Sequence, residues 1–227
     1  METSFPALSP AAPCEPLWEK KPMSEDRSHL WKWNKLETRA AGFDPDAVAR
    51  ADLLATVAAP WTNAHRCNNR VRRIADLLVE ELAASGAQGL VVGAPAVSDA
   101  ITQGTPSAGY SLVSRDLIAD CFETGHRAHH GNAMLVISGC DKSGAAALMP
   151  LARCNDPGLV IYPGTSSPGA VAVEPWAAKG PNLTIMDYAE AFAAQQSGRI
   201  SEEDLLAVER SIMPSSGTCG AMFTANT

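Results

Sequence analysis

The chain has 227 residues, of which 46% are hydrophobic and 19% charged, and its formal net charge is −7. This length and composition suffice for one large globular domain with a buried core, and the acidic balance offers no positive field to a nucleic-acid backbone. No apolar run approaches the roughly 18 residues that a membrane-spanning helix needs, and the N-terminus lacks the pattern of a secretory signal, so we expect a cytoplasmic protein.

Residues 1–43 form a first segment that mixes proline and charge with three tryptophans, Trp18, Trp31 and Trp33. Polar disordered segments rarely contain so many tryptophans, so we expect a partly ordered arm that packs on the body or on another subunit. The pattern changes at Asp44, an N-cap residue followed by a proline at the first helical position, and predicts a helix over residues 47–57.

Strands and helices alternate through most of residues 44–227. The predicted helices cover residues 71–84, 111–127, 145–153, 185–196 and 202–212, and the predicted strands cover 89–92, 159–162 and an apolar run from Met134 that stops at Gly139. This alternation predicts a three-layer α/β/α domain with a mainly parallel sheet. In such sheets ligands bind outside the carboxyl ends of the strands.

Six cysteines in a chain without an export signal do not indicate a disulfide scaffold. We expect Cys121 and Cys154 to be small buried hydrophobic residues and Cys14 to be a free thiol. The other three, Cys67, Cys140 and Cys219, lie at loop-to-helix junctions beside glycine or asparagine. Three such thiolates suit an iron–sulfur cluster with one open iron, but the spacing alone favours structural cysteines, because no Cys-x-x-Cys pair is present.

Charged groups follow two of the predicted strands. Asp99 and Asp141 lie in loops of small residues, where they could hold a divalent cation or cap the local turn. Lys142 directly follows a buried strand, a costly position unless the amine pairs with a carboxylate, stays hydrated or is chemically modified.

Four ordered motifs complete the pattern, and they are Val97-Ser-Asp99, the segment Tyr110–Asp120, Gly139-Cys-Asp-Lys142 and Gly217–Thr227. Together they resemble the dihydroxy-acid dehydratase and phosphogluconate dehydratase family, in order from about Trp61 to the last residue. The resemblance implies the fold of the N-terminal iron–sulfur domain of that family.

The resemblance also implies a set of ligands and a reaction. Cys67, Cys140 and Cys219 correspond to the ligands of a [2Fe–2S] or [4Fe–4S] cluster, and Asp99, Asp141 and a carbamylated Lys142 correspond to those of Mg²⁺. Asp141 and Lys142 would take part in metal-assisted catalysis. The family reaction removes water from a small 2,3-dihydroxy carboxylic or sugar acid and yields a 2-oxo acid.

The chain also departs from the family. Family members are more than twice as long, and their C-terminal barrel domain, absent here, supplies a serine base and a further acidic magnesium ligand. Ala145-Ala146 replace the usual proline and glycine, and Arg66 stands where proline is common. Thr102-Gln103-Gly104 resembles the sugar-acid members, whereas Val97-Ser98-Asp99 resembles the branched-chain type.

We therefore expect the cluster-bearing subunit of a split hydro-lyase, active as part of a heteromeric complex. A complementary subunit would carry the barrel domain and the base, with further oligomerisation possible. The alternatives are a non-catalytic iron–sulfur or scaffold protein derived from the family, or a truncated fragment.

Overall fold

A computed structural model describes residues 34–218, and residues 1–33 and 219–227 lie outside the described part. In chain order the elements are α2 (Lys35–Ala40), α3 (Pro45–Arg50), β1 (Leu54–Trp61), α4 (Val71–Ala84), β2 (Gln88–Pro95), α5 (Asp99–Thr102), α6 (Ala108–Ala128), β3 (Ala133–Ile137), α7 (Asp141–Cys154), β4 (Gly158–Ile161), the 3-10 helix η2 (Trp176–Lys179), α8 (Ile185–Gln196) and α9 (Glu202–Ser211). None of the helices in residues 34–218 is both long and apolar enough to cross a membrane. The tryptophans of the predicted arm fall outside the described residues, so the arm and its boundary stay predictions.

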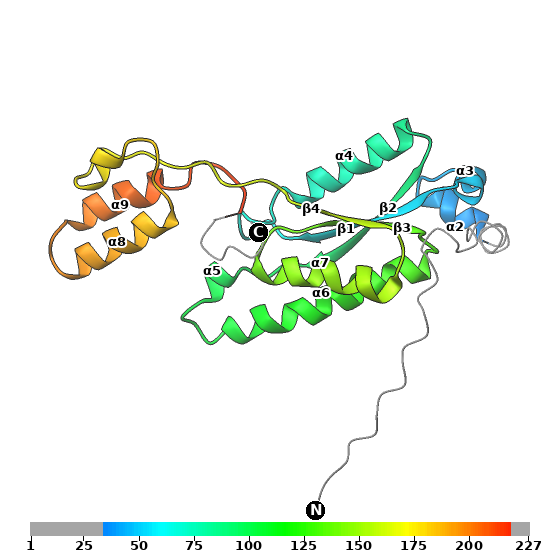
Figure 1. Cartoon of the computed structure of the whole chain (residues 1–227), viewed down its shortest axis with the longest axis horizontal. Coiled ribbons are helices and arrows are strands. Elements are labelled where there is room, and N and C mark those ends of the chain that lie inside the picture. Colours follow the sequence, from blue (N-terminus) through cyan, green and yellow to red (C-terminus); the bar gives the residue numbers. More distant parts are fainter. Residues whose placement is uncertain (1–33, 219–227) are drawn as a thin grey trace, which may run out of the picture.

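Four parallel strands form one sheet in the order β2-β1-β3-β4. The register places Val57 of β1 opposite Val91 of β2 and Leu135 of β3. Helix α4 packs on one face of the sheet, and α6 and α7 pack on the other (Figure 1). The three-layer α/β/α fold expected from the sequence is thus confirmed.

Strand β1 contributes to an apolar core on each face of the sheet. Val57 packs in the cluster that contains Val71 of α4, whereas Ala58 packs in the cluster that contains Phe122 of α6. Because successive side chains of a strand point to opposite faces, a central strand covered on both sides is largely apolar, and the one polar residue of β1, Thr56, forms a hydrogen bond with His126. Seven of the eight residues of β1 are accordingly buried.

The helix predicted over residues 47–57 is wrong, because α3 ends at Arg50 and β1 begins at Leu54. The segment is rich in alanine, which favours helix, and burial on both faces removes the alternation that identifies a half-exposed strand. Burial at the centre of the sheet therefore prevails over local propensity. The predicted helices over 71–84 and 185–196, in contrast, match α4 and α8.

Strands β1 and β3 are neighbours, but the chain leaves them toward opposite faces of the sheet. After β1 it passes through α4 to β2 on one side, and after β3 it passes through α7 to β4 on the other. In open α/β sheets, ligands bind outside the carboxyl ends of two adjacent strands whose connections run to opposite faces of the sheet. The loops that follow β1 and β3 are therefore the first place to look for a site.

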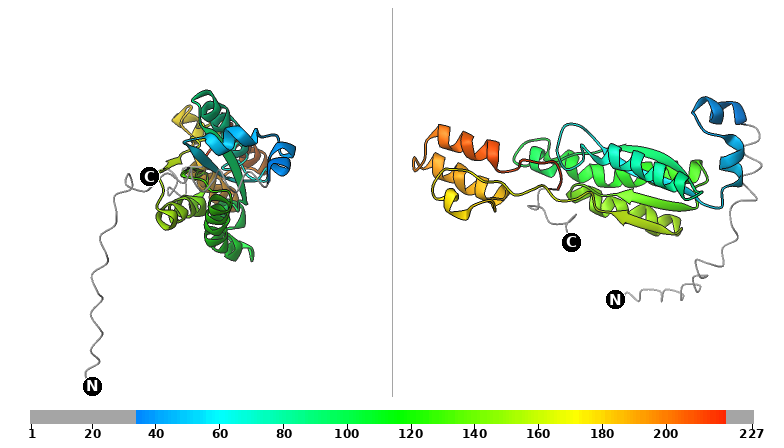
Figure 2. Two further views of the ribbon diagram at one scale, coloured as in Figure 1. Left: turned by 90° about the vertical axis from the view of Figure 1, so that its right-hand side faces the viewer. Right: turned by 90° about the horizontal axis from the view of Figure 1, so that it is seen from above.

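Helices η2, α8 and α9 form a lobe with a hydrophobic core of its own. Trp176, Leu183, Ala191 and Val208 are buried in this core. Figures 1 and 2 show that the lobe projects beyond one end of the α/β body. Its packing is therefore largely independent of the sheet.

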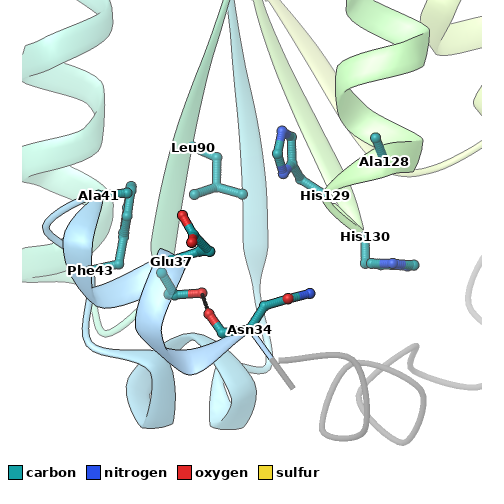
Figure 3. A pocket seen from close by; sticks show the side chains of 9 residues that line it. Asn34, Glu37, Ala41, Phe43, Leu90, Ala128, His129 and His130 are labelled. Carbon is teal, nitrogen blue, oxygen red and sulfur yellow. Dashed lines mark hydrogen bonds between the residues drawn. The ribbon is translucent and has the colours of Figure 1, made fainter. Parts of the chain in front are cut away.

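A cavity of about 500 Å³ lies at the amino-terminal edge of the sheet, between α2 and the end of α6. Phe43 and Leu90 contribute apolar surface, and Glu37, His129 and His130 contribute polar groups (Figure 3). The two imidazole rings lie apart in this view and do not converge on one point. The cavity contains none of the predicted site residues.

Candidate functional site

Two cysteines meet at the carboxyl ends of β1 and β3. Cys67 lies in the loop between β1 and α4, and Cys140 is the N-cap residue of α7. Both are buried, with exposed fractions of only 6% and 7%. The hydrogen bond with Cys67 lowers the pKa of the Cys140 thiol and outweighs the opposing effect of burial. Two of the three thiols that the sequence predicts as ligands thus lie side by side.

The close approach of the two loops depends on Gly139. A Cβ atom at this position would lie 2.4 Å from the Cys67 carbonyl oxygen and 2.9 Å from Oδ1 of Asn68. Asn68 fixes the first loop by donating a hydrogen bond of 2.6 Å from Nδ2 to the carbonyl of Pro60. The second loop is fixed by Ser143, whose Oγ accepts from the backbone nitrogen of Cys140 at 2.8 Å.

The charged groups predicted from the sequence also converge. Nζ of Lys142 lies 3.0 Å from Oδ1 of Asp99 and forms a short ion pair with Asp141. Hydrogen bonds with Asp141 and then Asp99 raise the pKa of Lys142 against the effect of burial. Ser111 of α6 donates from Oγ to Asp99 at 2.6 Å, and Sγ of Cys140 lies 3.9 Å from Oδ2 of Asp99. The three charged side chains therefore lie next to the thiol of Cys140.

A cavity of about 210 Å³ opens beside these groups. The described residues that line it are Asp99, Thr102, Gln103, Ala108, Asp141 and Lys142. The ammonium group of Lys142 neutralises the carboxylates of Asp99 and Asp141. A divalent cation bound at the same place could neutralise them as well. The carboxylate oxygens are the ligands that Mg²⁺ prefers, and a cavity of this size admits a small hydroxy acid.

Cys219 lies outside the described residues, but the segment that leads to it is fixed beside the Cys67 loop. The backbone nitrogen of Gly217 donates to the carbonyl of Arg66 at 3.2 Å. Nδ2 of Asn69 donates to Oγ of Ser216 at 3.1 Å. Thr218 donates from its backbone nitrogen to the Gly164 carbonyl at 3.0 Å. Hydrogen bonds therefore hold residues 216 and 217 against the loop that contains Cys67.

Sequence reasoning missed several polar groups of the site. Ser111 orients Asp99, and His65 is 93% buried, with an exposed fraction of 7%. Burial lowers the pKa of the His65 ring, although a hydrogen bond with the backbone of Ala96 and the charge of Asp99 act to raise it. Nη1 of Arg66 is buried without a hydrogen-bond partner in the described part of the chain. The sequence Thr-Asn-Ala-His-Arg before Cys67 contains no pattern that predicts which of its five side chains is buried.

The donor set fits the groups that the resemblance implies. Paired buried thiols are soft ligands suited to an iron–sulfur cluster, and paired carboxylates are hard ligands suited to Mg²⁺. Within residues 34–218 no three His, Cys, Asp or Glu residues are arranged to hold a metal ion. The third thiol lies beyond that range and Lys142 is not of these residue types, so the ligand roles stay predictions.

Comparison with known proteins gives a consistent result. A family model described as "Dihydroxy-acid/6-phosphogluconate dehydratase N-terminal" matches residues 54–227. The chain is 44% identical over 161 residues to dihydroxy-acid dehydratase 1 of Cupriavidus pinatubonensis, covering 71% of this chain and 28% of that protein. It is 45% identical over 161 residues to the dihydroxy-acid dehydratase of Polynucleobacter asymbioticus, covering 71% of this chain and 27% of that protein.

A third relative extends the match. The dihydroxy-acid dehydratase of Herminiimonas arsenicoxydans is 37% identical over 187 residues, covering 82% of this chain and 31% of that protein. The chain thus spans about 30% of the length of these curated relatives. The matched residues contain the loops and helix N-termini described above. The chain belongs to the dihydroxy-acid/6-phosphogluconate dehydratase family, and residues 54–227 correspond to its N-terminal domain.

Proposed function

We propose that this chain carries the iron–sulfur and magnesium half of a hydro-lyase active site, which converts a 2,3-dihydroxy carboxylic or sugar acid into a 2-oxo acid. The observation that supports it most is the meeting of two buried thiols with Asp99, Asp141 and Lys142 at one edge of the sheet. Relatives named dihydroxy-acid dehydratase share this part of the chain.

In this proposal Cys67 and Cys140, with Cys219, hold the cluster, and Asp99, Asp141 and Lys142 hold Mg²⁺. When bound, the cluster would act as a Lewis acid toward the leaving hydroxyl group, and Mg²⁺ would stabilise the developing enolate charge. Ser111 keeps Asp99 in place through its 2.6 Å hydrogen bond. The cavity of about 210 Å³ beside these residues receives the hydroxy acid.

Lys142 must be modified to act as a ligand, because an ammonium group repels a cation. Its neutral amine would form a bond from Nζ to the carbon of carbon dioxide and release a proton. The product is a carbamate with one negative charge. Asp99 and Asp141, now without the ammonium group between them, would share the metal with that carbamate.

We further propose that the base which removes the C2 proton comes from a complementary subunit. Apart from the three metal ligands, the described residues that line the cavity are Thr102, Gln103 and Ala108, and none of them is a suitable base. An exposed apolar stripe on α6 supports such a partner, since large exposed patches mark interaction sites. Tyr110, Val113 and Leu117 form this stripe, with exposed fractions of 71%, 63% and 48%.

The cluster is tested by iron and sulfide analysis of the full chain reconstituted without oxygen. We expect Cys140→Ser to lose most of the bound iron and the visible absorbance, because it removes one of the paired thiols. Cys121→Ser is the matched control, since Cys121 is a free cysteine on α6, away from the site, and should retain both. Equal iron content in the two variants would contradict the assignment.

A further inference from the structure

Helix α2 makes little contact with the rest of the described chain. It has only six residues, and its Leu36 is 78% exposed. Among the described elements α2 packs chiefly on α3, and a cavity of about 500 Å³ lies between α2 and the end of α6 (Figure 3). Because an isolated helix this short is unstable in water, α2 needs a further apolar contact to stay in place.

The floor of this cavity is continuous with a hydrophobic core. Phe43 and Leu90 line the cavity. Leu90 is only 8% exposed and is buried in one cluster with Val48 and Leu54, and Phe43 packs against that cluster. Cavities of about 300–1,000 Å³ hold small-molecule ligands, so this one has room for an aromatic ring. An apolar group that enters it would extend the core that joins α3 to the sheet.

Polar groups lie beside this apolar floor. Glu37 of α2 lines the cavity, as do His129 and His130 after the end of α6. An indole ring carries one N–H donor and no acceptor, and a buried tryptophan usually keeps that donor paired. The carboxylate of Glu37 supplies an acceptor at the cavity. Tryptophan therefore matches both the apolar floor and the polar rim.

The chain itself brings two tryptophans to this place. Asn34 lines the cavity, and Trp31-Lys32-Trp33 directly precedes it in the sequence. At about 3.3–3.6 Å per residue, three residues span roughly 10 Å, so both tryptophans can reach the cavity. A short tether also gives these side chains a millimolar effective concentration, which a free ligand or a second chain would have to match.

We propose that the segment Trp31–Trp33 docks in this cavity, packs indole rings against Phe43 and Leu90, and thereby fastens α2 to the end of α6. The N-terminal arm was expected to pack on its own body or on another subunit, and this proposal assigns the end of the arm to its own body. The cavity lies at the amino-terminal edge of the sheet, away from Cys140 and Lys142, so the inference does not depend on the proposed function.

The test is hydrogen exchange of the α2 amides in the full chain. The double substitution Trp31→Ala and Trp33→Ala should speed this exchange about tenfold or more, because it removes large buried apolar side chains. Trp18→Ala is the control and should leave the exchange unchanged, since Trp18 is 16 residues before Asn34. The β1 amides should stay equally protected in all variants, which shows that the sheet is folded. Unchanged α2 exchange in the double variant would overturn the inference.

A second variant tests the cavity from its other wall. Ala128 is the exposed last residue of α6, so Ala128→Glu places a charge at the cavity without disturbing the core. It should speed α2 exchange in the unsubstituted chain and have no further effect in the double tryptophan variant, because both changes disrupt one contact. Ala84→Glu is the matched control, since Ala84 is the exposed last residue of α4. Additive effects would show that the tryptophans act elsewhere and would overturn the inference.

Protein concentration separates this segment from other occupants. Docking within one chain predicts α2 exchange that is independent of concentration. Protection that increases with concentration would instead identify a second copy of the chain as the occupant. Protection that is lost after unfolding, dialysis and refolding would identify a small ligand. Either of these results would overturn the inference.

Discussion

Gly139 shows how one residue without a side chain positions two reactive ones. Its Cα lies so close to the loop after β1 that a Cβ atom would be 2.4 Å from the carbonyl oxygen of Cys67. That contact involves backbone and cannot be relieved by rotating a side chain. The spacing of Cys67 and Cys140 therefore depends on a glycine between β3 and α7.

We predict that Gly139→Ala separates the two loops and lowers the free energy of unfolding by about 1–3 kcal/mol, the usual cost of overpacking. Urea unfolding of the cluster-free chain measures this loss. Gly93→Ala is the control, because its Cβ would meet nothing within 4 Å, and its effect should stay within about 0.5 kcal/mol. Equal stability of the two variants would mean that the loops tolerate the separation.

Much of the site was predictable from the sequence, because its groups follow strands directly. Of the alternatives that the sequence left open for Lys142, the structure shows pairing with carboxylates, those of Asp99 and Asp141. The burial of His65 was not predictable, since it depends on contacts with residues such as Ala96 that are distant in the chain. Nothing in the local sequence indicates that Gly217 binds the Arg66 carbonyl.

At the level of elements, β1 shows where local pattern fails. Its alanines favour helix, and its two buried faces remove the alternation that would mark a strand. Helix α8, by contrast, was predictable with its first and last residue, because its amphipathic pattern and its capping residues lie within one segment. Its N-cap Thr184 and its third residue Asp187 form a capping box.

Asp187 ties the start of α8 to the rest of the lobe. Its Oδ2 accepts from the backbone nitrogen of Thr184 at 2.6 Å, and Oδ1 pairs with Lys179. Burial acts to raise the pKa of Asp187, but the hydrogen bonds from Lys179 and Thr184 prevail and lower it. A lowered pKa means that the contribution of the carboxylate to stability is present above its unfolded pKa of about 3.9.

We predict that this contribution disappears as the pH falls below about 3.9 and through the folded pKa of Asp187. At pH 7 Asp187→Asn should destabilise the lobe by about 1 kcal/mol, through loss of the ion pair and part of the cap. Hydrogen exchange of the α8 amides measures the difference between the variant and the unsubstituted chain. A difference that stayed constant from pH 6 down to pH 3 would rule out this assignment.

On the scale of the whole molecule, the exposed stripe on α6 begins next to the proposed half-site, since Ala108 at the start of α6 lines the cavity. Tyr110, Val113 and Leu117 are separated by three and four positions, so they share one face of the helix. Ile101 of α5, next to the lining residue Thr102, is also 59% exposed. A partner that covers this surface would be close to the cavity that we propose receives the hydroxy acid.

We predict that Val113→Glu weakens binding of the complementary subunit, because burying a valine contributes about 1.5–3 kcal/mol, a factor of ten or more in affinity. The tagged chain is purified from its source organism, and affinity for the protein that co-purifies is then measured. Leu36→Glu is the control, since Leu36 is 78% exposed on α2, away from the stripe. Equal weakening by both variants would show that the stripe does not form the interface.

The most direct test of the proposed half-site is 2-oxo acid formation by the cluster-loaded chain together with its co-purifying partner. We expect dehydration of a 2,3-dihydroxy carboxylic or sugar acid, and its loss in Lys142→Met while the iron content is retained, because this substitution removes a proposed magnesium ligand and none of the proposed cluster ligands. Dehydration by the isolated chain would contradict the proposal of a separate base-bearing subunit. A cluster-loaded complex that dehydrates none of these acids would contradict the catalytic account and would leave the non-catalytic iron–sulfur protein as the explanation.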